Sequence, residues 1–459
     1  MKYLLVIMVL TFSLFLRLKN NAFIPLPGES IDEYSNTWVG MSLLKFGIPI
    51  GISSDLNGYT SSIKAYVNVD QIYQTRGGDS LTIRKNWFDH PPLSGIITAL
   101  YTRLRGGSVF EDATTRNIRK PLIIVGVITT LCVFLIGLEI YNYQIALLAS
   151  VLYSISPTIL FGSRPVQSEN FLIPTILLSL YFLIKYLNNN KSLFIIISGI
   201  LFGISTLFKL SSIFFLPVVL ILILSKKNKA SLIGIGYFLV SFLPISLLFI
   251  TYGAAISLPD FINILFGNTQ RGFEIGPDLF DTLLLQTKIG FRTVPDLWVL
   301  LSWFAAIVTI SKINKKSKGF PLSIYFICYL IFFIILGGNG YSWYFLPFYP
   351  ITFIFMSKLV YKLLRQPQKY IIIYIFSMAI IGVYFRRIMG QPSPQYINPM
   401  WRYISILTIV PYVLSYIIVN NKLLNKGVRT LTYLLFATAI IISYIYIHNM
   451  SPEAWFQIY

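Results

Sequence analysis

Two adjacent carboxylates near the N-terminus are the first residues with types suited to chemistry. Asp32 and Glu33 follow Ser30, where the pattern predicts the start of a short helix. A carboxylate can accept a proton during catalysis, but negative charge also stabilises the N-terminus of a helix. Because neighbours in a helix point roughly 100° apart, at most one of the two can face a given site. Asp32 is the stronger functional candidate, whereas a role confined to the helix start fits Glu33 better.

A second group of chemically suited residues lies in the segment Asp89-His90-Pro91-Pro92. Apolar residues at helical spacing follow from Leu93 to Leu104, and together with the prolines they predict that a helix begins there. The free amides and the positive dipole end of such a helix can bind a phosphate, and His90 can add a donor. The alternative is that Asp89 caps the helix and that His90 is structural.

Further polar residues stand at the edges of apolar runs. Arg164 and Glu169 lie between two such runs, Lys209 lies in a very short turn, and Tyr341 and Tyr344 belong to a glycine-rich aromatic segment. Charges are costly in lipid and tend to face a protein interior, which favours a functional role. Cations and hydroxyls at these places suit a lipid-linked phosphate or a sugar. Snorkelling to headgroups and an interfacial aromatic belt are the alternatives.

The composition explains why these residues lie between apolar runs. Of 459 residues, 55% are hydrophobic and 12% are charged, about half the charged fraction of a soluble domain. A soluble globular protein is therefore excluded, and an all-α integral membrane protein is expected. At roughly 20 apolar residues per span, about thirteen spans would use ~260 residues. The expected spans are residues 3–16, 121–140, 144–162, 170–187, 192–208, 210–225, 230–252, 294–311, 320–337, 345–361, 370–385, 403–419 and 430–447.

The net charge of +20 follows the same pattern, because the basic residues cluster between the apolar runs. Membrane orientation explains them better than a nucleic acid partner does. With a cytoplasmic N-terminus, the strongly basic short loops all fall in the cytoplasm: 226–229, 312–318, 358–369 and 422–429. Four other segments then meet on the outer face: 20–120, the connection around Arg164, 253–293 and 337–350. The first run, 3–16, lacks a small-residue cleavage site and is expected to remain as a helix.

The outer loop is expected to contain a short helix that begins near Ser30. The sequence from Ser30 to Glu33 has the form of a capping box, and Gly47 precedes a proline that ends the helix. Apolar residues at helical spacing predict an amphipathic helix on the membrane surface. Cys132 and Cys328 lie in separate apolar runs without CxxC spacing, so neither a disulfide scaffold nor a zinc site is indicated.

Taken in order, these residues resemble the membrane glycosyltransferases of the GT-C superfamily, in the branch of protein O-mannosyltransferases and lipid A aminoarabinose transferases. The similar segments are Asp32–Tyr34, Phe88–Leu93, Arg164–Glu169, Gly199–Lys209 and Tyr341–Pro350. They cover most of residues 1–360, which we expect to form a GT-C-like module that includes the outer loop 20–120. Residues 361–459 hold the last three expected spans and no matching motif.

The resemblance implies that a sugar passes from a polyprenyl-phosphate donor to a lipid, glycan or protein acceptor, with inversion, on the extracytoplasmic face of the plasma membrane. It implies Asp32 as the catalytic base, with Glu33 less favoured. Glu169 falls at a second acidic position that is usually Asp, and His90 replaces the lysine of a Lys-Pro-Pro motif. Lys209 and Tyr344 match positions near the lipid phosphate. Asp89, Arg164 and Tyr341 complete the expected substrate-binding set.

The resemblance implies no certain cofactor. Some relatives bind a divalent metal, but the sequence shows no convincing set of matching ligands. A transporter or flippase of lipid-linked saccharides is an alternative, although it should show polar residues near mid-membrane rather than at one face. A polymerase or ligase of lipid-linked oligosaccharides shares the donor chemistry and is a third alternative.

Overall fold

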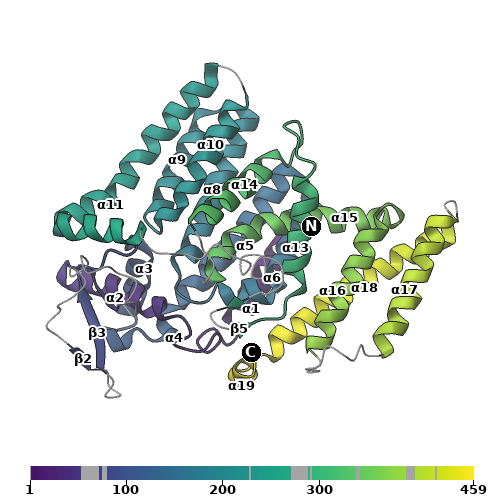
Figure 1. Cartoon of the computed structure of the whole chain (residues 1–459), viewed down its shortest axis with the longest axis horizontal. Helices are drawn as coiled ribbons and strands as arrows, with labels where there is room; N and C mark the ends of the chain where they lie inside the picture. The colour runs from purple at the N-terminus through teal and green to yellow at the C-terminus, as the bar shows by residue number, and fades with distance from the viewer. Residues whose placement is uncertain are drawn as a thin grey trace.

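The computed structural model describes residues 2–52, 72–74, 80–226, 229–269, 288–289, 292–336, 342–388, 399–418 and 421–458. Helices cover every apolar run expected from the sequence (Figure 1). Their bounds are α1 (Lys2–Leu18), α5 (Lys120–Ile140), α6 (Tyr143–Ile155), α7 (Pro157–Gly162), α8 (Ser168–Asn189), α9 (Ser192–Thr206), α10 (Phe215–Leu224), α11 (Lys229–Thr269), α13 (Leu297–Ile310), α14 (Phe320–Leu336), α15 (Tyr349–Arg365), α16 (Ile371–Ile388), α17 (Pro399–Ile417) and α18 (Lys422–Asn449).

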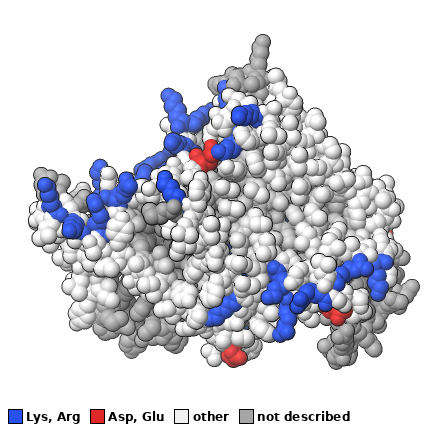
Figure 2. Space-filling model, turned by 180° about the vertical axis from the view of Figure 1, so that it is seen from behind, with Lys and Arg blue, Asp and Glu red and all other residues white. Residues whose placement is uncertain are grey.

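The lengths and compositions of these helices suit a membrane protein. Five helical stretches are long and apolar enough to cross a membrane, and seven shorter apolar helices accompany them in the described part. Figure 2 shows two groups of Lys and Arg separated by a broad surface without charge, as expected for a chain that spans a bilayer. The all-α membrane class is thus confirmed, whereas the number of thirteen spans stays a prediction.

The shorter elements gather on one side of the helices, along the lower edge of Figure 1: α2 (Ile31–Phe46), α3 (Leu93–Leu104), α4 (Thr115–Ile118), β5 (Arg292–Thr293) and α19 (Pro452–Phe456). Gln167 donates to the Ser30 hydroxyl, and Arg292 pairs with Glu29. The short 3-10 helix η4 (Ser342–Phe348) packs against α8. The four segments expected on one face therefore do meet, while the side that faces the cytoplasm stays a prediction.

Short strands accompany the helices of the first outer loop, where the sequence had predicted helices alone. The strands β1 (Ile50–Ile52), β3 (Ser80–Lys85) and β2 (Ile72–Gln74) pair antiparallel in the order β1-β3-β2. Ile50 lies opposite Lys85, and Tyr73 lies opposite Leu81. Strands of three to six residues give too few alternations for a clear period-two pattern.

Two expected spans differ in their ends. The run 144–162 divides at Ser156 into α6 and α7, because Pro157 starts a new helix and Asp296 accepts hydrogen bonds from the Ser156 hydroxyl and the Thr158 amide. The run expected to end at 252 continues as α11 to Thr269, bending at Ser257 two residues before Pro259. The loop expected at 253–293 therefore begins as helix.

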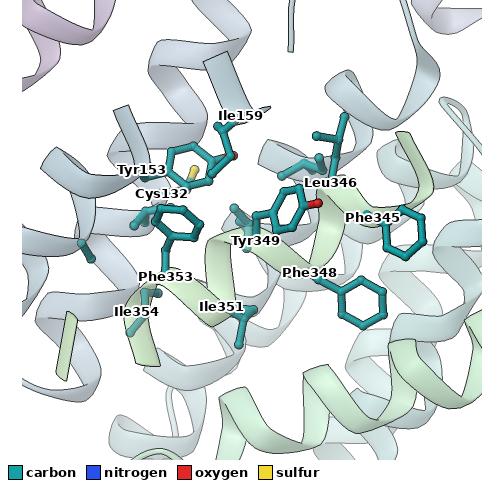
Figure 3. Packing of buried hydrophobic residues seen from close by; sticks show 14 of the residues in the cluster. Cys132, Tyr153, Ile159, Phe345, Leu346, Phe348, Tyr349, Ile351, Phe353 and Ile354 are labelled. Atoms are coloured by element: carbon teal, nitrogen blue, oxygen red, sulfur yellow. The ribbon is translucent and has the colours of Figure 1, made fainter. Parts of the chain in front are cut away.

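Small residues let neighbouring helices approach closely. Gly199 and Gly203 are spaced as in a GxxxG motif, and a Cβ on Gly199 would lie 2.7 Å from the Phe238 carbonyl oxygen of α11. Elsewhere the core is aromatic: Tyr153 of α6 and Phe353 of α15 meet edge to face with ring centroids 5.7 Å apart (Figure 3). Cys132 and Cys328 are buried free thiols.

The last described residues return to the first outer loop. Trp455 of α19 is fully buried, lies 5.3 Å from the Phe161 ring and donates to Glu29 at 2.8 Å. Arg292 donates at 2.8 Å to the carbonyls of Phe456 and Ile458. Part of the C-terminal region without a sequence motif thus contacts the segments that carry the candidate site.

Candidate functional site

Close packing of α2 against α3 positions the first candidate residues. A Cβ on Gly40 would lie 2.0 Å from the Gly95 carbonyl oxygen, and a Cβ on Gly95 would lie 2.0 Å from the Asn36 carbonyl oxygen. The helix predicted after Pro91-Pro92 is present as α3. Because the two backbones touch, the start of α2, with Asp32, is held relative to the start of α3, with His90.

The surroundings of α2 correct two expectations. The capping box is wrong: Ser30 precedes the helix but makes no side-chain cap, and its hydroxyl accepts from Gln167 instead. Residues 35–42 are all buried, so α2 is not an exposed helix lying on the membrane surface. It ends at Gly47, which adopts φ 69° as a left-handed cap.

Glu33 is held in a buried ion pair that the sequence did not predict. Both of its oxygens accept from Arg119, at 2.9 Å from Nε and 2.8 Å from Nη2, and both side chains are fully buried. Arg119 also donates to the carbonyls of Asn21 and Pro25. A carboxylate engaged on both oxygens is poorly placed to take a proton, which favours Asp32 as the base. The sequence feature that could have indicated this ion pair is the position of Arg119 at the very start of an apolar run.

Lys209 lies at the centre of the candidate site. It occupies the turn between α9 and the 3-10 helix η3 (Leu210–Phe214). Its ammonium pairs with Glu169 in the first turn of α8 and lies 4.3 Å from the centroid of the Tyr344 ring in η4. Lys209 and Glu169 are both buried.

The charge of Asp32 acts on both Lys209 and Tyr344, and the charge of Lys209 acts on His90. Five of the predicted residues, Asp32, His90, Glu169, Lys209 and Tyr344, therefore form one group, here called the Lys209 cluster. Burial alone would lower the pKa of Lys209, but the charges of Glu169, Tyr344 and Asp32 and the hydrogen bond to Glu169 together outweigh it, and the pKa is raised. Tyr344 contributes its phenolic hydroxyl to the cluster. The cluster thus offers a cation and a hydroxyl donor side by side.

His90 is neutral. Burial and the nearby charge of Lys209 lower its pKa to about 3, against a hydrogen bond to the Asp89 backbone that raises it. Its ring meets Trp87 edge to face at 5.8 Å. The Leu93 amide, in the first turn of α3, donates to the Leu207 carbonyl oxygen at 3.4 Å, so this amide is not free for a phosphate. His90 can therefore contact an anion as a neutral donor rather than as a cation.

Arg164 contacts the end of α1. Its guanidinium donates to the carbonyls of Leu16, Lys19 and Ile24, and it lies 4.9 Å from the Phe161 ring. It thus satisfies carbonyls at and beyond the C-terminal end of α1, and its role at the donor phosphate stays a prediction. Asp89 is half-buried beside His90. Tyr341 lies outside the described residues.

Two buried polar atoms at the site have no hydrogen-bond partner in the described part of the chain: Oε2 of Glu169 and Nε1 of Trp87. Tyr329 was missed by the sequence analysis, because it lies within an apolar run with no distinguishing signal. Its hydroxyl donates at 2.6 Å to the Tyr344 carbonyl oxygen and so supports η4. A narrow cavity of about 20 Å³ is lined in part by Ser30, Gln167 and Trp343. These residues are close neighbours in the sequence of Asp32, Glu169 and Tyr344.

The donor set does not fit a metal ion. Across the described ranges, no group of three His, Cys, Asp or Glu side chains lies close enough together to hold one. Glu169 is already paired with the Lys209 ammonium, and the charge of Asp32 also acts on Lys209.

Comparisons with known proteins extend these observations. Residues 89–249 match the family model of dolichyl-phosphate-mannose-protein mannosyltransferases, a range that holds His90, Glu169 and Lys209. ArnT from Cupriavidus metallidurans bound to undecaprenyl phosphate superposes with a TM-score of 0.59 at 15% identity, over 99% of this chain and 76% of that chain. The chain has the GT-C glycosyltransferase fold.

The same GT-C fold is found in further structures. ArnT in the apo state gives the same TM-score of 0.59 at 15% identity, over 99% of this chain and 76% of that chain. The Archaeoglobus fulgidus oligosaccharyltransferase, in a complex with Zn and sulfate, gives a TM-score of 0.53 at 14% identity, over 89% of this chain and 55% of that chain. No curated protein matches the sequence. The resemblance noted from the motifs is thus confirmed for the fold.

Proposed function

We propose that this chain is a glycosyltransferase that moves a sugar from a polyprenyl-phosphate donor to a lipid, glycan or protein acceptor, with inversion at the anomeric carbon. The Lys209 cluster carries this proposal, because it combines carboxylates, a buried cation and a hydroxyl at one end of the helices. The mannosyltransferase family match over residues 89–249 and the fold shared with an undecaprenyl-phosphate-bound enzyme support it.

The proposed reaction needs two kinds of group. The acceptor oxygen or nitrogen attacks the anomeric carbon while the bond from that carbon to the phosphate oxygen breaks, and its electron pair leaves with the polyprenyl phosphate. Asp32 accepts the proton lost by the acceptor. Lys209, the Tyr344 hydroxyl and neutral His90 stabilise the charge that develops on the departing phosphate.

Glu169 is proposed to position the acceptor. One of its oxygens pairs with Lys209, and the other is buried without a partner in the described residues. A buried carboxylate oxygen with no donor is costly, and a hydroxyl or amine of the acceptor would satisfy it. The longer Glu, where relatives usually have Asp, would extend this oxygen further from the backbone of α8.

The location of the charges argues against a transporter. Lys209 and Glu169 lie at the ends of helices, where the short elements α2, α3 and η4 also gather, and not at the middle of a long helix. Transporter sites use polar or broken segments near mid-membrane. We further propose that this end faces outward at the plasma membrane and that the N-terminus is cytoplasmic.

The test is sugar transfer by the purified full chain in detergent, with a labelled polyprenyl-phosphate hexose and a panel of acceptors. Turnover in the wild type and its loss in Asp32→Asn, with donor binding retained, would support the proposal. Binding of the donor without transfer or hydrolysis in the wild type would contradict it, and a liposome translocation assay would then test the transporter alternative.

A further inference from the structure

A second cavity lies next to the buried Glu33–Arg119 pair, because Asn21, which accepts from Arg119, is part of its lining. It has a volume of about 350 Å³ and lies between the end of α1, the end of α3, α4 and the start of α5. Its polar lining includes Asn21, Tyr101, Arg105, Arg116, Asn117 and Lys120. The Lys209 cluster contributes no residue to it.

The lining of this cavity is strongly basic. Arg105, Arg116 and Lys120 bring three positive charges, and the lining contains no Asp or Glu. Among the described residues, none of the three forms an ion pair. Three cations in the lining of one cavity, with no Asp or Glu among its described lining residues, favour an anionic ligand.

Asn21 gives an independent indication of a ligand. Its side chain is only 3% exposed, it lines the cavity, and neither its amide nitrogen nor its amide oxygen has a hydrogen-bond partner among the residues that the structure describes. A buried amide left unpaired costs about 1–3 kcal/mol. A ligand that offers a phosphate oxygen to the nitrogen and a hydroxyl to the oxygen would satisfy both atoms.

Apolar side chains surround the opening of the cavity. Leu18 and Phe23 line it and are each 47% exposed, and Leu104, next to Arg105, is 84% exposed. Exposed apolar residues beside basic ones are typical of a protein surface at the boundary between headgroups and acyl chains. The ligand therefore reaches the cavity from the membrane.

We propose that this cavity binds the phosphodiester headgroup of an anionic membrane lipid, with a hydroxylated headgroup such as glycerol. The three cations hold the phosphate, and the Asn21 amide contacts the phosphate and the headgroup hydroxyl. The acyl chains lie along Leu18, Phe23 and Leu104. Zwitterionic lipids bind more weakly, because their cationic headgroup meets three positive charges.

A chain of contacts links this cavity to the Lys209 cluster. The Asn21 carbonyl accepts from Arg119 at 3.2 Å, and Arg119 holds Glu33, the neighbour of Asp32. A lipid that orders the segment around Asn21 therefore stabilises the start of α2. This consequence does not depend on the proposed sugar transfer, because lipid binding and thermal stability can be measured without turnover.

The test is native mass spectrometry and thermal unfolding of the full chain in detergent, with phosphatidylglycerol and phosphatidylcholine of the same acyl chains. Phosphatidylglycerol should bind more tightly and raise the melting temperature more. Removal of each cation should weaken the binding of phosphatidylglycerol about fivefold. Arg105→Gln/Arg116→Gln should thus bind about 25-fold more weakly, and salt should reduce the preference of the wild type.

Arg103→Gln is the matched control, because Arg103 is an exposed cation in the last turn of α3, two residues before Arg105, and does not line the cavity. Asn21→Leu tests the amide separately and should lower the selectivity for phosphatidylglycerol. Glycerol phosphate, which lacks acyl chains, should not compete with phosphatidylglycerol for the cavity. If it competed as well as the lipid does, the ligand would be a soluble phosphate ester and not a lipid. Equal binding of both lipids, or an equal loss in Arg103→Gln and the double variant, would overturn the proposal.

Discussion

The ammonium of Lys209 lies 4.3 Å from the centroid of the Tyr344 ring and pairs at the same time with Glu169. Three segments that are distant in the sequence, the start of α8, the turn after α9 and the 3-10 helix η4, thus share one buried cation. Because Glu169 already neutralises Lys209, an arriving phosphate must share the cation with this carboxylate. The affinity for the donor therefore depends on the balance between the two.

This balance predicts opposite effects of two substitutions on donor binding. Glu169→Gln should tighten binding of a polyprenyl phosphate by about fivefold or more, since ~1 kcal/mol of competing charge is removed. Lys209→Met should weaken it by at least the same factor. Both variants should transfer sugar more slowly, and equilibrium binding of a labelled polyprenyl phosphate separates affinity from turnover.

Lys209→Met also leaves Glu169 as a buried, unpaired charge, which lowers stability on its own account. The double variant Lys209→Met/Glu169→Gln is the control, because it removes both charges. It should regain stability but not the affinity of the wild type. If the double variant also bound the donor like the wild type, Lys209 would have no role at the phosphate.

The two adjacent carboxylates should respond differently to loss of charge. Asp32→Asn should reduce turnover by about 10²- to 10⁴-fold, the usual contribution of a general base, with little change in melting temperature. Glu33→Gln breaks a fully buried bidentate pair with Arg119 and should cost about 3–5 kcal/mol of stability. Thermal unfolding and single-turnover kinetics on both variants distinguish the two roles. A stable, inactive Glu33→Gln beside an active Asp32→Asn would reverse the assignment.

The lowered pKa of His90 predicts a particular pH dependence of stability. His90 has a pKa of about 3 in the folded protein against 6.5 for an ordinary histidine. Between these values the unfolded chain binds a proton that the folded chain does not, so the free energy of unfolding decreases as the pH falls below 6.5. Above 6.5 His90 contributes no pH dependence.

His90→Gln, which keeps a neutral donor, should make this decrease less steep than in the wild type. Unfolding curves at closely spaced pH values between 4 and 8 measure the difference, since all other titrating groups are shared. Donor binding by the wild type should show no step near pH 6.5 from His90. A step there that disappears in His90→Gln would mean that His90 binds phosphate as a cation.

The sequence predicted the membrane helices well, because runs of apolar residues are long and leave few alternatives. It also predicted that Asp32, His90, Glu169, Lys209 and Tyr344 would lie at one end of the molecule, since short turns between spans alternate from side to side. The order of the motifs along the chain also indicated which of these residues belong to one group.

Side-chain pairing could not be predicted in the same way. Arg164 and Arg119 both adjoin an apolar run, yet Arg164 donates to backbone carbonyls, whereas Arg119 donates to carbonyls and also pairs with Glu33. Nothing in the local sequence separates these outcomes, because the partners are about 90 to 150 residues away. The short strands of the outer loop were missed for another reason, because strands of three to six residues give no clear period-two pattern.

The contact between α2 and α3 predicts that glycine is required at position 95. Alanine usually stabilises a helix relative to glycine by about 0.5–1 kcal/mol. In Gly95→Ala, however, the new Cβ would lie 2.0 Å from the Asn36 carbonyl oxygen, so the two helices must separate. Overpacking of this kind costs about 1–3 kcal/mol, and separation of α2 from α3 would also displace Asp32 from the Lys209 cluster.

Gly236→Ala is the matched control, since a Cβ there meets no atom within 4 Å. Gly95→Ala should therefore lower the melting temperature, whereas Gly236→Ala should leave it unchanged or raise it. Gly95→Ala should also lose turnover at temperatures where it remains folded, because its base has moved, while Gly236→Ala should keep it. A Gly95→Ala variant as active and as stable as Gly236→Ala would show that the contact between α2 and α3 does not position Asp32.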